Sequence, residues 1–316
     1  MRHLGEKEGS VISLRQHAIS LVAVFLALAV GVVLGSGFVA DTFGSSSDAQ
    51  DEREQQLRDE NQQLSSNLNA ANNFDAAIAG RLLGGSLKDR PVLIITTPNA
   101  DEGDIAAVKD NLNKSGAIFN GQLALTEAFI SDQNAEKMRS IIDQSIPPGS
   151  ELRTELTDSG GRAGDLLGLL LNLSPEDAEP QVSSSDTTAG LAALKQGGFV
   201  DYANGAVKPA QLSIVVTGNK FADDSGARGQ VIGRFAVAFA QRGSGTVLVG
   251  RTGSAEGSSP IAVVRADPSL NSKISTVDNV DQATGRITTV LALTDELGNK
   301  QGAFGTGPGA TAIAPE

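Results

Sequence analysis

The chain has 316 residues and a formal net charge of −12, and it contains neither cysteine nor tryptophan. The acidic balance argues against nucleic-acid binding, and the absence of cysteine excludes disulfides, thiolate nucleophiles and cysteine-ligated metal centres. With only one Tyr and 11 Phe, any core must be built mainly from Val, Ile, Leu and Ala.

Residues 18–40 are the strongest local signal, because they contain no charged residue and only two serines interrupt the apolar and small ones. As a helix this stretch is about 34 Å long, enough to cross a hydrocarbon core. A signal peptide is the alternative, but its apolar region usually has about 7–15 residues. We therefore expect an uncleaved transmembrane helix.

The charges that flank this stretch predict its orientation. Arg2, Lys7 and Arg15 precede it, whereas Asp41 and Asp48 follow it before any Lys or Arg. A basic excess on the first side predicts a cytoplasmic tail over residues 1–17 and a C-terminal part outside the cytoplasm. We expect a single-pass protein of the inner membrane, with outer-membrane placement as the alternative that a family resemblance described below implies.

Small residues recur at four-residue intervals within the expected span, at Ala27, Gly31 and Gly35. Such spacing lets two transmembrane helices pack closely. The alternative is the ordinary glycine content of membrane helices.

A polar linker over residues 41–51 is expected to lead into a helical stalk over residues 52–80. Apolar residues recur there at heptad spacing, which predicts a short coiled coil and a homodimer. The candidate contact residues are Leu57, Asn61, Leu64, Leu68 and Ala71. Asn61 at a core position would fix a two-stranded register. The alternative is a lone amphipathic helix that holds the following domain away from the membrane.

Residues 88–301 are expected to form an extracytoplasmic α/β domain with a mainly parallel sheet flanked by helices, because strand and helix patterns alternate. Strands are predicted at 91–97, 117–125, 211–217, 245–250 and 261–265. Helices are predicted at 101–115, 131–145, 165–173, 189–197, 227–242 and 281–297. Residues 302–316 are rich in Gly, Ala and Pro, and we expect a flexible tail.

Charged residues near the ends of these elements are candidates for a polar pocket or a partner-binding surface. They are Arg251, Arg265, Asp278 and Arg286. The alternative is a structural network of ion pairs.

Beyond the membrane the chain has no His, and Met138 is its only Met. Ser-His-Asp and Cys-His arrangements and the usual catalytic zinc sites therefore cannot form there. Two pairs of acids, Asp158 with Asp165 and Asp278 with Asp281, could meet as catalytic carboxylates, but solvated surface acids are the preferred interpretation.

Two glycine-rich loops, at residues 250–257 and 305–309, match neither phosphate-binding motif and are expected to form turns, the first of them leading into a strand. We therefore predict no enzyme, no catalytic or metal-binding residue and no cofactor.

Several segments together resemble the actinobacterial MctB family over residues 11–309. They are ISLRQHAISL (12–21), AVGVVLGSG (29–37), ANNFD (71–75), AGDLLG (163–168), GSGTVLVGR (243–251), ISTVD (274–278) and GRIT (285–288). The resemblance implies copper transport and copper homeostasis, through efflux pores in the mycobacterial outer membrane. A similar coryneform branch, SteB-like, is associated with cell separation beside a cytoplasmic partner.

The scarcity of copper ligands and the length of the predicted strands favour a scaffold over a copper pore. Copper prefers thiolate, thioether and imidazole ligands, and the exported part offers one Met. A barrel pore needs alternating strands of about ten residues, whereas the strands predicted here are short apolar runs. We therefore expect a dimeric scaffold or regulator that binds a cytoplasmic partner through residues 1–17 and an envelope protein through the α/β domain. The alternatives are a copper efflux pore and an envelope hydrolase.

Overall fold

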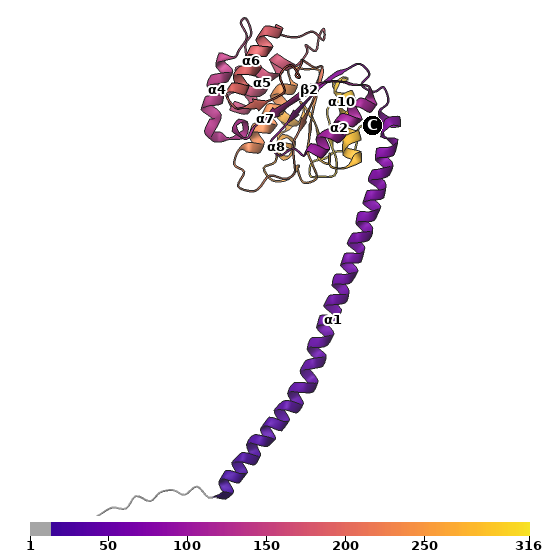
Figure 1. Ribbon diagram of the computed structural model, residues 1–316, viewed down its shortest axis with the longest axis vertical. Coiled ribbons are helices and arrows are strands. Elements are labelled where there is room, and N and C mark those ends of the chain that lie inside the picture. The colour runs from indigo at the N-terminus through magenta and orange to yellow at the C-terminus, as the bar shows by residue number, and fades with distance from the viewer. Residues whose placement is uncertain (1–13) are drawn as a thin grey trace, which may run out of the picture. The chain divides into compact units, whose positions relative to one another are not determined.

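The computed structural model describes the backbone of residues 14–316 and the side chains of residues 23–28 and 51–316 (Figure 1). The described chain divides into two units, with the boundary between Asn69 and Ala70. A single helix, α1, runs over Leu14–Leu83, where we expected a span, a linker and a stalk as separate segments. Within the described residues, no helix combines the length and hydropathy needed to span a membrane.

The second unit is built on a seven-stranded sheet in the order β3-β2-β1-β4-β5-β6-β7. The strands are β1 Pro91–Thr96, β2 Ile118–Leu125, β3 Val200–Asp201, β4 Leu212–Val216, β5 Gly245–Val249, β6 Ser275–Val277 and β7 Ala303–Phe304. Every pairing is parallel except that of β2 with β3. The α/β fold with a mainly parallel sheet is therefore confirmed.

Helices cover both faces of this sheet (Figure 1). Alternate residues of β1 point to opposite faces, so Leu93 and Ile95 join one core cluster while Val92 and Ile94 join the other. The helices after α1 are α2 Glu102–Ser115, α3 Glu127–Ile130, α4 Ala135–Gln144, α5 Ser159–Leu171, α6 Ser184–Gln196, α7 Arg228–Ala240, α8 Pro260–Ala266, α9 Pro268–Asn271 and α10 Ala283–Glu296, with a 3-10 turn at Asp132–Asn134.

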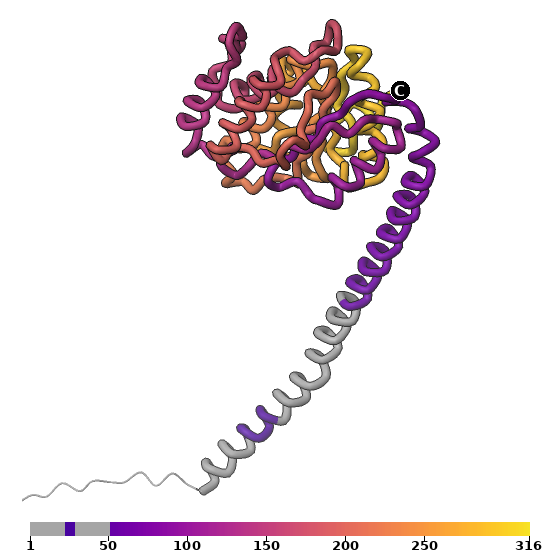
Figure 2. Tube along the Cα trace, turned by 45° about the horizontal axis from the view of Figure 1, so that its top comes forward, coloured from indigo at the N-terminus to yellow at the C-terminus, as the bar shows by residue number. Residues whose placement is uncertain are grey.

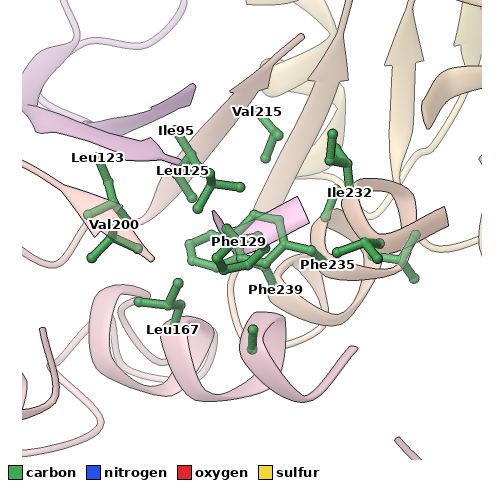
Figure 3. Packing of buried hydrophobic residues seen from close by; sticks show 14 of the residues in the cluster. Ile95, Leu123, Leu125, Phe129, Leu167, Val200, Val215, Ile232, Phe235 and Phe239 are labelled. Atoms are coloured by element: carbon green, nitrogen blue, oxygen red, sulfur yellow. The ribbon is translucent and has the colours of Figure 1, made fainter. Parts of the chain in front are cut away.

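The larger core cluster lies between the sheet and helices α3 to α8 (Figure 3). Phe129 meets Phe235 edge to face, with ring centroids 5.3 Å apart, and Phe239 lies 5.9 Å from Phe235. Figure 3 shows these rings between Ile95 of β1 and Leu167 of α5. Edge-to-face packing adds to the stabilisation from apolar burial, which is why a chain with so few aromatic residues places three here.

Helices α5 and α7 approach closely because α5 presents glycine every four residues. A Cβ atom on Gly160 would lie 2.3 Å from the carbonyl oxygen of Val231, and one on Gly164 would lie 2.3 Å from that of Phe235. At Gly168 the added atom would meet the Arg242 side chain at 2.8 Å. Any larger side chain on this face would force the two helices apart.

The opposite face is covered by α2, α10 and the last turns of α1. Ala79 and Leu83 of α1 are buried in the same cluster as Val108 of α2 and Val290 of α10. Figure 2 shows the C-terminus on the side of this unit where α1 ends. The last turns of α1 are therefore part of the domain core.

The predicted strand at 261–265 is wrong, because these residues lie in α8. Pro260 occupies the first turn, where its missing N–H costs nothing. Ile261 and Val264 are buried, which is helical spacing and not strand alternation. The loop at 250–257 consequently leads into a helix, contrary to our expectation.

The C-terminal segment also differs from the expected flexible tail. Ala303 and Phe304 form β7, which pairs in parallel with β6. The chain then turns back so that Ala312 bridges to Phe304, and the Thr311 N–H donates to the Ala303 carbonyl at 2.7 Å. Glycine and proline serve here to make tight turns against the sheet edge.

Candidate functional site

Polar residues gather at one edge of the sheet, where the parallel strands β1, β4, β5 and β6 all end. In a parallel sheet the carboxyl ends of the strands meet at the same edge, and ligands usually bind there. The residues that follow these four strands include Asn99, Gly218, Arg251 and Asp278. We call this region the carboxyl edge.

Two of the candidate pocket residues, Arg265 and Asp278, form a buried ion pair. The Arg265 guanidinium lies 2.5 Å from the Asp278 carboxylate, and their side chains are only 3% and 1% exposed. Arg265 also donates to the carbonyls of Phe304 at 2.8 Å and Pro308 at 3.0 Å. Burial lowers the pKa of Arg265, although its hydrogen bond to the Asp278 carboxylate opposes this effect. Because the guanidinium is buried and each of its nitrogens donates to the protein, the pair is a structural clamp.

The clamp holds the C-terminal turn against the sheet. Asp278 accepts hydrogen bonds from the backbone N–H groups of Thr306, at 2.9 Å, and Gly307, at 3.1 Å. A Cβ atom on Gly305, whose φ is +124°, would lie 2.2 Å from the Asp278 carboxylate. Glycine at 305 is therefore required both by conformation and by space, and the loop at 305–309 is a turn as expected.

Arg251 belongs to a different cluster of charges at the carboxyl edge. Its guanidinium lies 3.1 Å from Asp104 and 3.5 Å from Asp101. Burial is the largest influence on Asp104 and raises its pKa, while Arg251 lowers it. The Asp101 carboxylate also caps the N-terminus of α2, because it accepts hydrogen bonds from the N–H groups of Gly103 and Asp104.

Arg286 stabilises the turn that precedes α10 and so completes this second cluster. It donates to the carbonyls of Val280 at 3.3 Å and Asp281 at 3.1 Å. The Asp281 carboxylate in turn accepts from the N–H of Thr252 at 2.8 Å. Of the four candidate pocket residues, Arg265 and Asp278 are therefore bonded to each other. Arg251 pairs instead with Asp104, and Arg286 bonds to the backbone before α10.

The acids considered as catalytic pairs have separate partners. Asp158 caps α5 by accepting from the N–H of Gly161 at 2.8 Å. Asp165, which is fully buried, accepts from Arg153 at 2.8 Å and from Arg242 at 2.6 Å. Burial alone would raise the pKa of Asp165, but the hydrogen bonds from both arginines outweigh it and lower the pKa. Neither Asp158 with Asp165 nor Asp278 with Asp281 is arranged as a pair of opposed carboxylates.

The stalk candidates lie on α1 with their side chains exposed. Leu57, Leu64 and Leu68 are 53%, 59% and 50% exposed. The Asn61 amide donates to the Leu57 carbonyl of its own helix at 2.9 Å, and Ala71 is exposed. The leucines are therefore available to a partner helix.

The N-terminal candidates lie largely outside the described residues. Ala27 is exposed on α1, whereas the environments of Gly31 and Gly35 are not described. Most of the expected cytoplasmic tail, residues 1–13, also lies outside the described part of the chain.

Sequence reasoning missed how the end of α1 contacts α10. The Asn72 side chain accepts a hydrogen bond from the N–H of Ala283, at 3.1 Å, and Asp75 accepts one from the Thr284 hydroxyl, at 2.8 Å. No side chain of its own caps the first turn of α10. Asn72 therefore supplies a cap from a distant part of the sequence. The only sequence signal was the ANNFD segment within the family resemblance.

Soft metal ligands are scarce in the described part of the chain. Met138 of α4 is 1% exposed and packed in the larger core cluster. No group of three or more His, Cys, Asp or Glu side chains among the described residues is placed to hold a metal ion.

Comparison with known proteins gives one consistent result. Residues 11–315 match the family described as "Copper transport outer membrane protein, MctB". Over 310 residues the chain is 44% identical to the Copper transporter MctB of Mycobacterium tuberculosis, and over 323 residues it is 44% identical to that of Mycobacterium leprae. Each alignment covers 96% of this chain and 99% of the relative.

Proposed function

The chain belongs to the MctB family, and on that premise we propose that it acts in copper transport and copper homeostasis at the cell envelope. The observation that carries this proposal is the extent of the similarity. The relatives named as copper transporters are matched at 44% identity over 99% of their own length. Similarity of this extent includes the stalk, the sheet and the C-terminal turn together, so it supports a shared role for the whole chain.

We further propose that the protein acts in copper homeostasis as a scaffold and not as the path of the ion. Copper is bound most readily by thiolate, thioether and imidazole groups. Among residues 51–316, whose side chains the structure describes, Met138 alone carries one of these groups, and its side chain is buried in the core. An α/β domain of this kind suits binding to a partner protein of the envelope. The other candidate, an efflux pore formed by the protein itself, follows the family description.

The decisive experiment measures total cellular copper under copper load in a strain that lacks the protein, with the parent and a complemented strain as controls. We expect copper to accumulate and complementation to reverse it. The Met138→Leu variant separates the two candidates, because it removes the thioether while keeping an apolar side chain of similar volume. Failure of Met138→Leu to complement, with normal protein levels, would support a direct path for copper and contradict the scaffold.

Septation scored in the same cultures tests the second role that the family resemblance implies. Chained cells with normal copper would assign the protein to cell separation and overturn the copper proposal. Raised copper with normal septation would support the copper proposal.

We propose that residues 18–40 anchor the protein in the inner membrane, with residues 1–17 in the cytoplasm. The support is their uncharged sequence and the basic residues before it. Because the chain has no cysteine, a single introduced thiol reports its own location. A membrane-impermeant maleimide should label Ser65→Cys but not Ser10→Cys in intact cells whose outer layer has been made permeable. The reverse pattern, or recovery of the protein in the outer-membrane fraction, would overturn this topology.

We also propose that the stalk forms a parallel homodimer through Leu57, Leu64 and Leu68. The cysteine-free chain makes disulfide crosslinking a direct test. Under mild oxidation Leu57→Cys, Leu64→Cys and Leu68→Cys should form crosslinked dimers, whereas Ser66→Cys, on another face of the same helix, should not. Equal crosslinking at all four positions would indicate random collision and contradict the coiled coil.

A further inference from the structure

The strand order changes direction between β1 and β4, and a pocket lies at this point of the carboxyl edge. The chain leaves β1 for α2 on one face of the sheet and leaves β4 for α7 on the other. Loops that diverge in this way leave a crevice, the usual ligand site of open α/β sheets. The pocket here has a volume of about 400 Å³. It is lined by Asn99 after β1, by Lys220 and Phe221 after β4, and by Ile130 and Arg228.

The Asn99 amide has a fixed orientation at this pocket. Its Oδ1 atom accepts from the Thr97 hydroxyl at 2.7 Å and from the Thr217 hydroxyl at 3.3 Å. Gly218 lets the two loops approach, because a Cβ atom there would lie 2.1 Å from the Asn99 carbonyl oxygen. With the oxygen held by the two hydroxyls, the Nδ2 group remains as a donor at the pocket.

Two cations line the same pocket, and each forms only a long ion pair with a carboxylate. Lys220 lies 3.9 Å from Glu256, and Arg228 lies 3.5 Å from Glu127. The buried pair Arg265–Asp278, by contrast, is separated by 2.5 Å. Ion pairs as long and exposed as those of Lys220 and Arg228 contribute little energy, so both side chains can turn to a ligand.

The other residues that line the pocket determine the size and charge of a ligand that it can bind. Ile130 and Phe221 are 3% and 9% exposed and provide an apolar wall. Glu127 and Asp224 also line the pocket, so a ligand with several negative charges would be repelled. These features suit one negative charge attached to a small apolar group.

We propose that this pocket binds a small organic carboxylate, with its charged group between Arg228, Lys220 and the Asn99 amide and its apolar part against Ile130 and Phe221. A carboxylate matches the paired donors of a guanidinium. The proposal is independent of any role in copper transport, since none of these groups is a copper ligand of the soft class.

The test is calorimetric titration of the full chain in detergent at low salt, with 4-methylpentanoate as the probe. We expect saturable binding below about 10 mM, as suits a probe of so few atoms. The isosteric neutral 4-methylpentanamide and inorganic phosphate should bind at least about fivefold more weakly. Equal binding of the amide, tighter binding of phosphate, or no binding of the carboxylate would each overturn the proposal.

A matched pair of variants locates the site. Arg228→Gln should weaken binding of 4-methylpentanoate at least about fivefold, because it removes the principal cation from the pocket. Arg234→Gln is the control, since Arg234 lies on the same helix, is similarly exposed and pairs with Asp158 at the same 3.5 Å. We expect Arg234→Gln to change the affinity less than about twofold. Equal weakening by both variants would indicate only a general effect of charge and would contradict the assignment.

Discussion

Asp165 shows how strongly a single residue can hold segments of this protein together. Its carboxylate is buried and accepts hydrogen bonds from Arg153, in the loop before α5, and from Arg242, after α7. Asp165→Asn should therefore destabilise the domain by about 3–5 kcal/mol, the usual cost of leaving a buried charge without its partner. Thermal or urea unfolding measures this cost. Asp143→Asn, which breaks an exposed pair with Arg162, is the control and should cost about 1 kcal/mol or less.

Asp165 also makes the free energy of unfolding depend on pH. Its pKa is lower in the folded protein than the ordinary value of 3.8, so the unfolded chain binds the proton more tightly. The stabilisation is complete above the unfolded value and is lost as the pH falls through the folded value. The difference in unfolding free energy between the parent protein and Asp165→Asn should accordingly shrink below about pH 4. A constant difference down to strong acid would contradict this assignment.

Glu296 makes the stability of the protein depend on pH in the opposite direction. Burial raises its pKa, while hydrogen bonds from Ser275 and Gln301 lower it only in part. The folded state therefore holds the proton more tightly, and stability falls as the pH rises from about 4.5 through the folded value. Glu296→Gln should raise stability by about 1 kcal/mol at pH 7, because it removes a buried charge while keeping an acceptor for the Ser275 N–H. Melting curves at pH 7 and pH 4 test this, since the gain should be smaller at pH 4.

At the residue scale the sequence suggests four charged residues as candidates but does not specify how they are paired. Arg265 and Asp278 were selected because they lie near element ends, and the structure joins them at 2.5 Å. Arg251 and Arg286 share this location, yet Arg251 pairs with Asp104 and Arg286 bonds to backbone carbonyls before α10. The pairing depends on how the turns after β5, β6 and β7 fold back, and no local pattern specifies that.

At the scale of elements, the buried strands were the most predictable feature. β1, β4 and β5 lie in the sheet interior and consist mainly of apolar residues without strict alternation, which is the signature of a strand covered on both faces. β6 was missed because it contains only three residues, Ser-Thr-Val. The segment at α8 was misread because a short run of Ile, Ala and Val suits either structure, and packing against α7 decides the outcome.

The contact between α5 and α7 predicts a sharp difference between two glycine substitutions. Gly164→Ala would bring Cβ within 2.3 Å of the Phe235 carbonyl oxygen, so it should cost at least about 2 kcal/mol through displacement of the helices. Gly80→Ala is the control, because that helical glycine has nothing within 4 Å of the added atom. It should stabilise the protein by about 0.5–1 kcal/mol through higher helix propensity. Chemical denaturation of both variants measures the contrast.

The distant cap on α10 can be tested in the same way. Asn72→Ala removes the acceptor of the Ala283 N–H and should cost about 1 kcal/mol, as loss of a helix cap does. The adjacent Asn73 is exposed, so Asn73→Ala is a matched control that should change stability by less than about 0.5 kcal/mol. Hydrogen exchange of the first amides of α10 should accelerate in Asn72→Ala alone. Equal exchange in both variants would show that Asn72 is not the cap.

At the scale of the whole molecule, the C-terminal segment completes the α/β unit. Deleting residues 303–316 would remove β7 and the turn that supplies most of the partners of Arg265 and Asp278. We expect a loss of several kcal/mol, because it leaves a buried ion pair without its hydrogen bonds, and the variant should become sensitive to protease. Deleting only Pro315 and Glu316 is the control and should leave the protein resistant. A resistant 303–316 deletion would contradict this role of the C-terminus.

The two outermost strands limit how one molecule can pair with another. β3 and β7 each contain only two residues, and residues 206–209 meet the rest of the outer side of β2, where the Lys208 N–H donates to the Asn120 carbonyl. A neighbouring molecule that reached either margin of the sheet would find few free backbone groups with which to extend it. Molecules at high concentration can therefore lie close together without joining their sheets, and any association must depend on contacts between side chains.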